Sequence, residues 1–580
     1  MRSIYDATTR LVATVLLLTH GGLSHGALMA DAPRPVILEA FDAVMALPAG
    51  QPKDQLLRDI GRELASSGRI EEAKAAATAI GYINGRPLLQ RAIALRQATD
   101  GDLAAALRTV GEIDAPQLPD SRDQAISAVA VVRAEAGDMG GVLKAILSIS
   151  RPEMRANALG IVMRARAEAG DVEWALSLAS KFPPGMQAQG LTGVARVMAE
   201  HGDTEAAVGL TQRESASTPA IFLAIAQGRE KAGDLEGAAG FAGRIIGKDV
   251  DWGMEGKAKV IVIRDLAARG EIARAREAAA LPWKKPAITP QNRRSPPSTD
   301  AFERDAARAI AKGAAASGDV AGARSDLPRF PVHSRVMALV GIADELEKAG
   351  QRPVAERLVT VAEKEAVDGL GFYYGELGAA QYRLGRIEAS RESIDKAMHA
   401  KEIGTPVNQR VIVAAQGRAG DLEGAKATIE TISEPDLRDQ ARAWLAGILA
   451  KQGRAELALD AAHAIADRLQ RAATLAHLGK AFAGSGDRVR AVGTCREAVG
   501  VIGDEQPPAE VARIITHGWA STPEEVASAS AWARGLKGDE ARAAALLGVV
   551  EGELGRPIWL AVSPYSIPGL EPFTGQASEN

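Results

Sequence analysis

The sequence is poor in cysteine and in aromatic residues. It holds one cysteine, Cys495, among 580 residues, and Phe, Trp and Tyr together make up 4% of the chain. A single cysteine excludes an intramolecular disulfide framework and any zinc site built on several cysteines. The small residues that dominate instead, among them 59 glycines, favour close packing of helices and leave few aromatic side chains for ligand binding.

The chain also has no excess of positive charge. It carries 69 Lys and Arg against 73 Asp and Glu, for a net charge of -4. A general nucleic-acid binder needs a basic surface to displace counterions. This balance therefore argues against nucleic acid as a partner.

Sequence motifs of catalysis and metal binding are missing as well. There is no Gly-x-Ser-x-Gly elbow and no His-Glu-x-x-His helix, and the histidines are scattered singly. Metal sites need clustered ligands. We therefore predict no catalytic residue, no metal and no cofactor, and we expect Cys495 to be a small core residue.

The amino terminus has the order of a secretory signal. Arg2 and Arg10 precede a compact apolar run over residues 11–19, and small residues follow. The run is shorter than the roughly 20 residues that a membrane-spanning helix needs. We predict a signal peptide over residues 1–30, no membrane span, and a periplasmic or secreted protein.

The rest of the chain is a repeat, with a glycine as its most regular element. Eleven of the twelve intervals between successive turn glycines fall between 31 and 37 residues, and eight of the thirteen glycines are followed by Asp. Glycine adopts the left-handed conformation that ends one helix, and Asp caps the next. The turn glycines are Gly68, Gly101, Gly137, Gly170, Gly202, Gly233, Gly270, Gly318, Gly350, Gly385, Gly420, Gly453 and Gly486.

Other positions also recur at a fixed distance from the turn glycine, and we call each such set of equivalent residues a column. Eight residues before each glycine stands an aliphatic residue, and five residues after it stands Ala in eleven of thirteen units. Apolar residues at helical spacing lie on both sides of the turn. The unit is therefore predicted to be two amphipathic helices joined by a tight turn.

These units resemble tetratricopeptide repeats, which are two-helix units of about 34 residues. The resemblance runs from Val36 to Gly555 and is weakest at the aromatic positions of that family. It implies an all-α, right-handed superhelical α-solenoid of about 13–15 repeats. The pentatricopeptide family, whose turns look similar, remains an alternative.

Irregular segments divide the predicted array. Five prolines between 282 and 299 predict a Pro-rich basic loop or linker, which separates repeat block one, 36–281, from block two, 300–503. Residues 504–556 read as an atypical C-terminal helical cap, and 557–580 as a tail. The loop is interpreted as a hinge, with a docking role as the alternative.

One pattern of charge points to a binding surface. In the resembling family the first helix of each unit lines the concave face, and the residues ten and six before the turn glycine point towards it. Here these two columns hold ten cations and one acid, Asp344, which predicts a basic groove for an anionic partner. The alternative is a solvated helix face whose charges pair locally. The predicted groove residues are Arg58, Arg62, Arg91, Arg164, Arg196, Arg264, Arg308, Lys312, Arg410 and Lys480.

These features favour a non-enzymatic scaffold of a bacterial cell envelope that binds a peptide-like or protein partner in the groove. Two other hypotheses stay open. One is an envelope enzyme of the α-solenoid kind that acts on glycans, and the other is a cytosolic, pentatricopeptide-like RNA binder. The oligomeric state and the partner's identity do not follow from the sequence.

Overall fold

The structure is a computed structural model, which describes residues 35–82, 85–114, 120–213, 216–283, 300–327, 332–366, 371–399 and 406–558. The predicted signal peptide lies outside these ranges. So do nearly all of the Pro-rich loop and of the tail.

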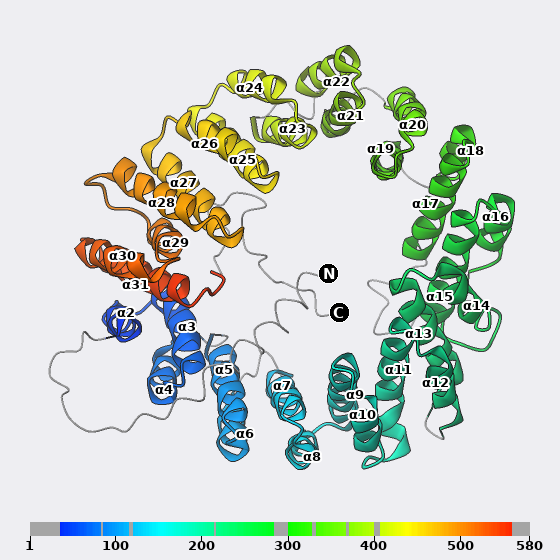
Figure 1. The fold of residues 1–580 in the computed structure, drawn as a ribbon, viewed down its shortest axis with the longest axis horizontal. Coiled ribbons are helices and arrows are strands. Elements are labelled where there is room, and N and C mark those ends of the chain that lie inside the picture. The colour runs from blue at the N-terminus through cyan, green and yellow to red at the C-terminus, as the bar shows by residue number, and fades with distance from the viewer. Residues whose placement is uncertain are drawn as a thin grey trace.

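Throughout the described ranges the only regular secondary structure is helical, and the helices form consecutive antiparallel pairs. The first helix of each pair lies on the inner side of the molecule (Figure 1). These inner helices are α3 (Gln51–Ser66), α5 (Gly85–Thr99), α7 (Ser121–Glu135), α9 (Pro152–Glu168), α11 (Pro184–Glu200), α13 (Thr218–Lys231), α15 (Trp252–Ala268), α17 (Asp300–Ala316), α19 (Val332–Lys348), α21 (Gly371–Arg383), α23 (Pro406–Ala419), α25 (Pro435–Lys451), α27 (Arg468–Gly484) and α29 (Ala509–Trp519).

The second helix of each pair is shorter in most units and lies on the outer side. A short 3-10 helix, η1 (Leu210–Gln212), extends one of them. The outer helices are α4 (Ile70–Ala79), α6 (Leu103–Gly111), α8 (Met139–Ser148), α10 (Val172–Ala179), α12 (Thr204–Gly209), α14 (Leu235–Ala242), α16 (Ile272–Ala280), α18 (Val320–Ser325), α20 (Arg352–Glu365), α22 (Ile387–His399), α24 (Leu422–Glu430), α26 (Ala455–His463), α28 (Arg488–Ile502) and α30 (Pro523–Gly535).

The predicted turn is confirmed in all thirteen units that carry a turn glycine, whereas the pair α29 and α30 is joined without one. All thirteen turn glycines have φ between 74° and 93°, a region that side chains with a Cβ rarely adopt. Seven of the eight Asp residues that follow them accept a hydrogen bond from a backbone amide in the first turn of the outer helix. Asp203 is the exception, and the helix that it precedes is only six residues long.

The predicted columns form the core. The aliphatic residues eight before the glycine are buried in all units except that of Val262, which is partly buried. The small residues five after it are at most 2% exposed. Cys495 is also fully buried, and burial raises the pKa of its thiol to about 12, so its role as a core residue is confirmed.

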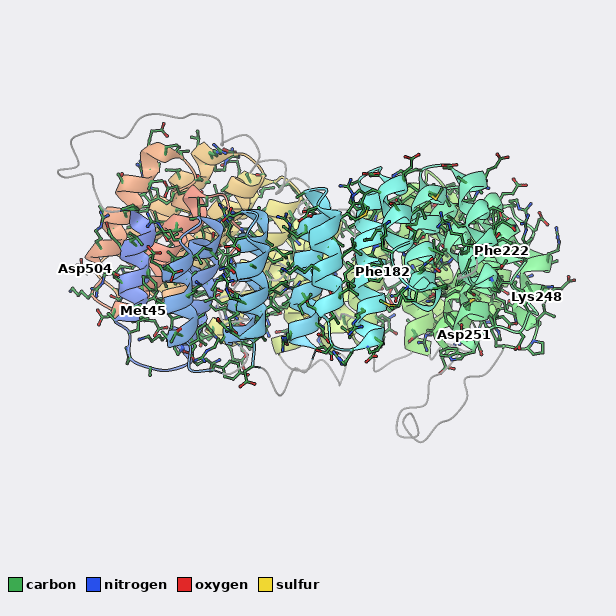
Figure 2. The ribbon with its side chains drawn as sticks, turned by 90° about the horizontal axis from the view of Figure 1, so that it is seen from below. Met45, Phe182, Phe222, Lys248, Asp251 and Asp504 are labelled. Carbon is green, nitrogen blue, oxygen red and sulfur yellow. The ribbon has the colours of Figure 1, made fainter. Side chains whose placement is uncertain are left out.

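The stack of repeats closes on itself to form a ring (Figure 1). The blue N-terminal helices α2 (Val36–Met45) and α3 lie beside the red C-terminal helix α31 (Asp539–Glu553). In the view from below, Met45 at the end of α2 lies on the same side of the molecule as the orange C-terminal part of the chain, against which α2 packs (Figure 2). The tetratricopeptide-like array of two-helix units is thus confirmed, and its closure is a feature that the sequence analysis did not predict.

A further repeat is assembled from the two ends of the chain. Helix α31 follows the rule of an inner helix, since Leu547 is eight residues before Gly555, which has a φ of 61°. It packs against the preceding pair, α29 and α30, but no outer helix follows it in the described ranges. Helix α2 takes that place: it packs against α31 on one side and against α3 on the other.

The segment expected to be a C-terminal cap therefore has a different role. A cap covers the last apolar face of an open array. Here one apolar cluster contains Ala40 and Val44 of α2 together with Ala543 and Leu547 of α31. The last face is covered by the first helices of the same chain.

The Pro-rich segment does not interrupt the stacking. Helix α17, which follows it, packs against α15 and α16, which precede it. Ile263 and Ile310 from the two sides share one apolar cluster. The two predicted blocks are thus continuous in packing. None of the helices in the described part of the chain is long and apolar enough to cross a lipid bilayer.

Candidate functional site on the inner wall

A hollow of about 210 Å³ opens between three consecutive inner helices, α9, α11 and α13. Its lining comes from equivalent positions in three units, because residues 13, 10, 9 and 6 before the turn glycine share one helix face. The two columns proposed from the sequence to face a groove therefore do line a common surface here. The lining residues are Asn157, Gly160, Ile161, Arg164, Gln189, Thr192, Gly193, Arg196, Ala224 and Gln227.

Small residues shape this hollow. A Cβ at Gly160 would lie 3.2 Å from Cγ of Gln189, and one at Gly193 would lie 3.4 Å from Cβ of Arg164. On the next interface, a Cβ at Gly228 would come within 2.3 Å of the backbone oxygen of Arg196. The glycines let the three helix backbones approach, so that long polar side chains form the rim of a shallow floor.

The rim combines guanidinium and amide groups. Nε2 of Gln189 donates to Oδ1 of Asn157 at 3.1 Å, which joins α11 to α9. Nε of Arg164 is 3.7 Å from a carboxylate oxygen of Glu168 on its own helix, a long contact on a partly exposed pair. Arg196 has no ion pair with a carboxylate of the residues described here. The hollow therefore presents hydrogen-bond donors and net positive charge.

Other predicted groove cations are paired within the wall. Arg58 and Arg62 both lie 3.0 Å from Oδ1 of Asp59. Arg308 and Lys312 contact Glu345 at 2.8 and 2.6 Å, and these contacts hold the pKa of that carboxyl low despite its burial.

Arg264 bridges two neighbouring units. It contacts Glu230 of α13 at 2.9 Å and Asp305 of α17 at 3.6 Å. These ion pairs connect neighbouring inner helices. They also neutralise much of the positive charge that the sequence pattern indicated.

The remaining three lie apart from the hollow. The guanidinium of Arg410 stacks on Trp444 at 5.2 Å and contacts Gln440, and burial lowers its pKa. Lys480 is half-buried on α27, and Arg91 is half-buried on α5. The structure therefore brings Arg164 and Arg196 together in one hollow and distributes the other eight around the ring.

Sequence reasoning missed the neutral members of the site. Gln227 stands in the same column as Arg164 and Arg196, and Asn157 and Gln189 share the column 13 before the glycine. A search for amides as well as charges in these columns would have found them. Within the residues that the structure describes, no three His, Cys, Asp or Glu side chains are grouped as metal ligands.

No protein-family model matches the chain, and no curated protein matches it. Solved structures do resemble it. The crystal structure of the APC/C hetero-tetramer Cut9-Hcn1 aligns at 13% identity over 83% of this chain and 98% of that one, with a TM-score of 0.19. Ton1535 from Thermococcus onnurineus NA1 aligns at 14% over 70% and 97%, with a TM-score of 0.19.

A circular tandem repeat protein with novel repeat topology and enhanced subunit contact surfaces aligns at 15% over 90% and 99%, with a TM-score of 0.10. Scores this low carry no inference about function. The chain is a tetratricopeptide-like helical repeat protein by its own geometry.

Proposed function

We propose that this ring is a non-enzymatic scaffold of a bacterial cell envelope, which holds an acidic, extended segment of a protein partner on its inner wall. The observation that carries the proposal is the hollow between α9, α11 and α13. It is the place where the predicted groove columns meet an opening large enough for a side chain.

The chemistry of the rim fits a peptide with carboxylates. The planar fork of an arginine matches a carboxylate in two-point contact, and Arg164 and Arg196 stand on adjacent helices. The amides of Asn157, Gln189 and Gln227 offer both donors and acceptors, which suits the backbone of an extended chain. A carboxylate with peptide groups on either side uses all of these partners.

The envelope setting rests on the order of the first 30 residues, in which charge, an apolar run and small residues follow one another. Fractionation of cells into cytoplasm, membranes and periplasm tests it. Recovery in the cytoplasm with residues 1–30 intact would contradict it and would favour the RNA-binding alternative.

Binding tests the hollow directly. We expect Arg164→Gln with Arg196→Gln to weaken binding of an acidic peptide by about 10- to 30-fold, because each partly exposed charged contact contributes about 1 kcal/mol after screening. The probe is a fluorescent peptide that alternates Glu and Ser, measured by anisotropy. The affinity of the native ring should also fall as salt rises.

The matched control removes the same charge elsewhere. Arg108→Gln with Arg488→Gln changes two exposed arginines on the outer helices α6 and α28 and should leave binding unchanged. Equal loss in both variants would mean that net charge alone attracts the peptide. Tighter binding of an RNA oligonucleotide than of the peptide would overturn the proposal.

A further inference from the structure

The junction between α31 and the pair α2 and α3 differs in kind from every other junction in the ring. At each of the others, the chain itself runs from one repeat into the next. Here the two sides are the two ends of the folded chain, and they are joined by non-covalent contacts alone. We call this junction the seam, with α2 and α3 on one side and α29, α30 and α31 on the other.

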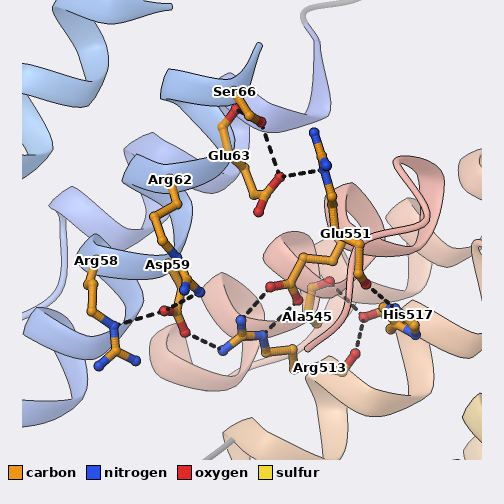
Figure 3. Close-up of polar contacts among 11 residues, drawn as sticks. Arg58, Asp59, Arg62, Glu63, Ser66, Arg513, His517, Ala545 and Glu551 are labelled. Atoms are coloured by element: carbon orange, nitrogen blue, oxygen red, sulfur yellow. Dashed lines mark hydrogen bonds and ion pairs between the residues drawn. The ribbon is translucent and has the colours of Figure 1, made fainter. Parts of the chain in front are cut away.

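Buried charges lie at the centre of the seam (Figure 3). Nη1 of Arg513 on α29 donates to Oδ2 of Asp59 on α3 at 2.9 Å, and its Nε donates to Oε2 of Glu551 on α31 at 2.9 Å. All three side chains are at most 5% exposed. A buried ion pair is strongly destabilised when one partner is removed, because a bare charge stays behind.

This network is arranged so that opening the seam leaves no bare charge. Arg513 keeps Glu551, which lies on its own side. Asp59 keeps Arg58 and Arg62, which lie on its own helix. On each side of the seam, every one of these charged groups thus keeps an oppositely charged partner. Separation breaks the contact between Arg513 and Asp59 but leaves neither group without an ion pair.

The other cross-seam ion pairs are weaker. Arg534 contacts Glu39 at 2.8 Å on a partly exposed surface, and Arg556 is 3.6 Å from Glu63. The partly exposed pair of Arg534 and Glu39 adds little to stability, and the pair of Arg556 and Glu63 is more buried but long. On the apolar side, α2 is a helix of ten residues that buries only Ala40 and Val44 completely. Helix α3 also packs against α31, and the two share one apolar cluster, so each opening exposes part of this cluster and the seam stays closed most of the time.

We propose that the seam is a door, through which a polypeptide with blocked ends enters the ring from the side. A polypeptide whose two ends are blocked cannot be threaded through a closed ring, so a side entrance is the route by which the ring comes to surround such a chain. The opening of the seam does not depend on the proposed function. The acidic character of the polypeptide that enters does rest on the proposed function.

Thiol labelling tests the opening without any ligand. In a Cys495→Ala background, Ala40→Cys on α2 is compared with Ala238→Cys on α14, a fully buried residue five after its turn glycine. We expect the seam thiol to react with DTNB at least about tenfold faster, because local opening exposes it. Glu63→Cys on α3 is a second probe, because the neighbours of Glu63 across the seam are Glu551 and Arg556. Fraying of α2 alone would therefore not expose this thiol.

A lock supplies the control. A short bis-maleimide that joins Glu39→Cys to Arg534→Cys ties α2 to α30. A third cysteine, Glu63→Cys, is chemically protected during this cross-linking and deprotected afterwards. Its reaction with DTNB should then be slower than in the protein without the cross-link. Labelling of Ala40→Cys and Glu63→Cys as slow as that of Ala238→Cys would overturn the proposal. So would labelling that the lock does not slow.

The entry route is tested with two forms of one probe. The first is the free acidic Glu-Ser peptide, and the second is the same peptide held between two folded domains, each larger than the ring. The unlocked ring should bind both, and the locked ring only the free peptide. Capture of the blocked peptide by the locked ring would overturn the door. If neither form binds to either ring, the proposed function is wrong, and the labelling alone decides whether the seam opens.

Discussion

At the scale of the residue, a few positions repeated around the ring set the fold. The left-handed glycine and the Asp cap end one helix and begin the next, and their regular spacing made the turns predictable from the sequence. The aliphatic and Ala columns were equally predictable, because burial demands the same residue type in each unit. The partners of individual charges were not, since Arg264 meets Glu230 and Asp305 from neighbouring units.

His517 on α29 is another residue whose hydrogen-bond partner could not be predicted from the sequence. Its Nε2 donates to the backbone oxygen of Arg556 at 2.8 Å. Burial, with smaller contributions from Lys480 and Arg513, lowers its pKa from 6.5 to about 4. The folded protein therefore keeps this ring neutral in a range where the unfolded chain binds a proton.

The sign of the pH dependence follows. The contribution of His517 to stability is complete above pH 6.5 and is lost as the pH falls from 6.5 to about 4, by at most about 3 kcal/mol. His517→Gln keeps the donor without the titration, so its urea midpoint should depend less on pH in this window than that of the native protein. The raised pKa of Glu63 and Glu551 acts in the opposite direction in both proteins and cancels in the difference. The exposed His463→Gln serves as the control, and an unchanged pH dependence in His517→Gln would contradict the assignment.

At the scale of the element, the two terminal helices are the informative ones. Helix α31 carries Leu547, Gly548 and Gly555 in the spacing of an inner helix, so its type could be read from the sequence. That its outer partner would be α2, some 500 residues earlier, could not be read. Pairing of distant segments depends on the curvature accumulated over all the repeats, which no local pattern records.

The same substitution at two positions separates the seam from the body of the ring. Ala175 on α10 and Ala40 on α2 are both fully buried against an inner helix. Ala175→Leu should overpack its repeat and cost about 1–3 kcal/mol, with lost hydrogen-exchange protection in α9, α10 and α11. Ala40→Leu should instead release α2 and lower protection only around α2, α3 and α31. A uniform loss across all repeats in either variant would contradict the picture of repeats that touch only their neighbours.

At the scale of the whole molecule, closure gives this array an inside. An open solenoid offers its concave face to any partner, whereas this ring surrounds the site between α9, α11 and α13. The sequence predicted the two-helix array and its repeat number, because both follow from local periodicity. It did not predict a ring, because an open and a closed array share the same columns and differ only at their ends.

The most direct measurement of the closed ring is a distance between its two ends. Spin labels at Glu39→Cys on α2 and Arg534→Cys on α30, in a Cys495→Ala background, report this distance by double electron–electron resonance. A closed ring predicts one dominant short distance that persists on dilution of the monomer, since Glu39 and Arg534 form an ion pair across the seam. A long or broad distance in the monomer, or a short one that disappears on dilution, would show that the two ends of one chain do not meet.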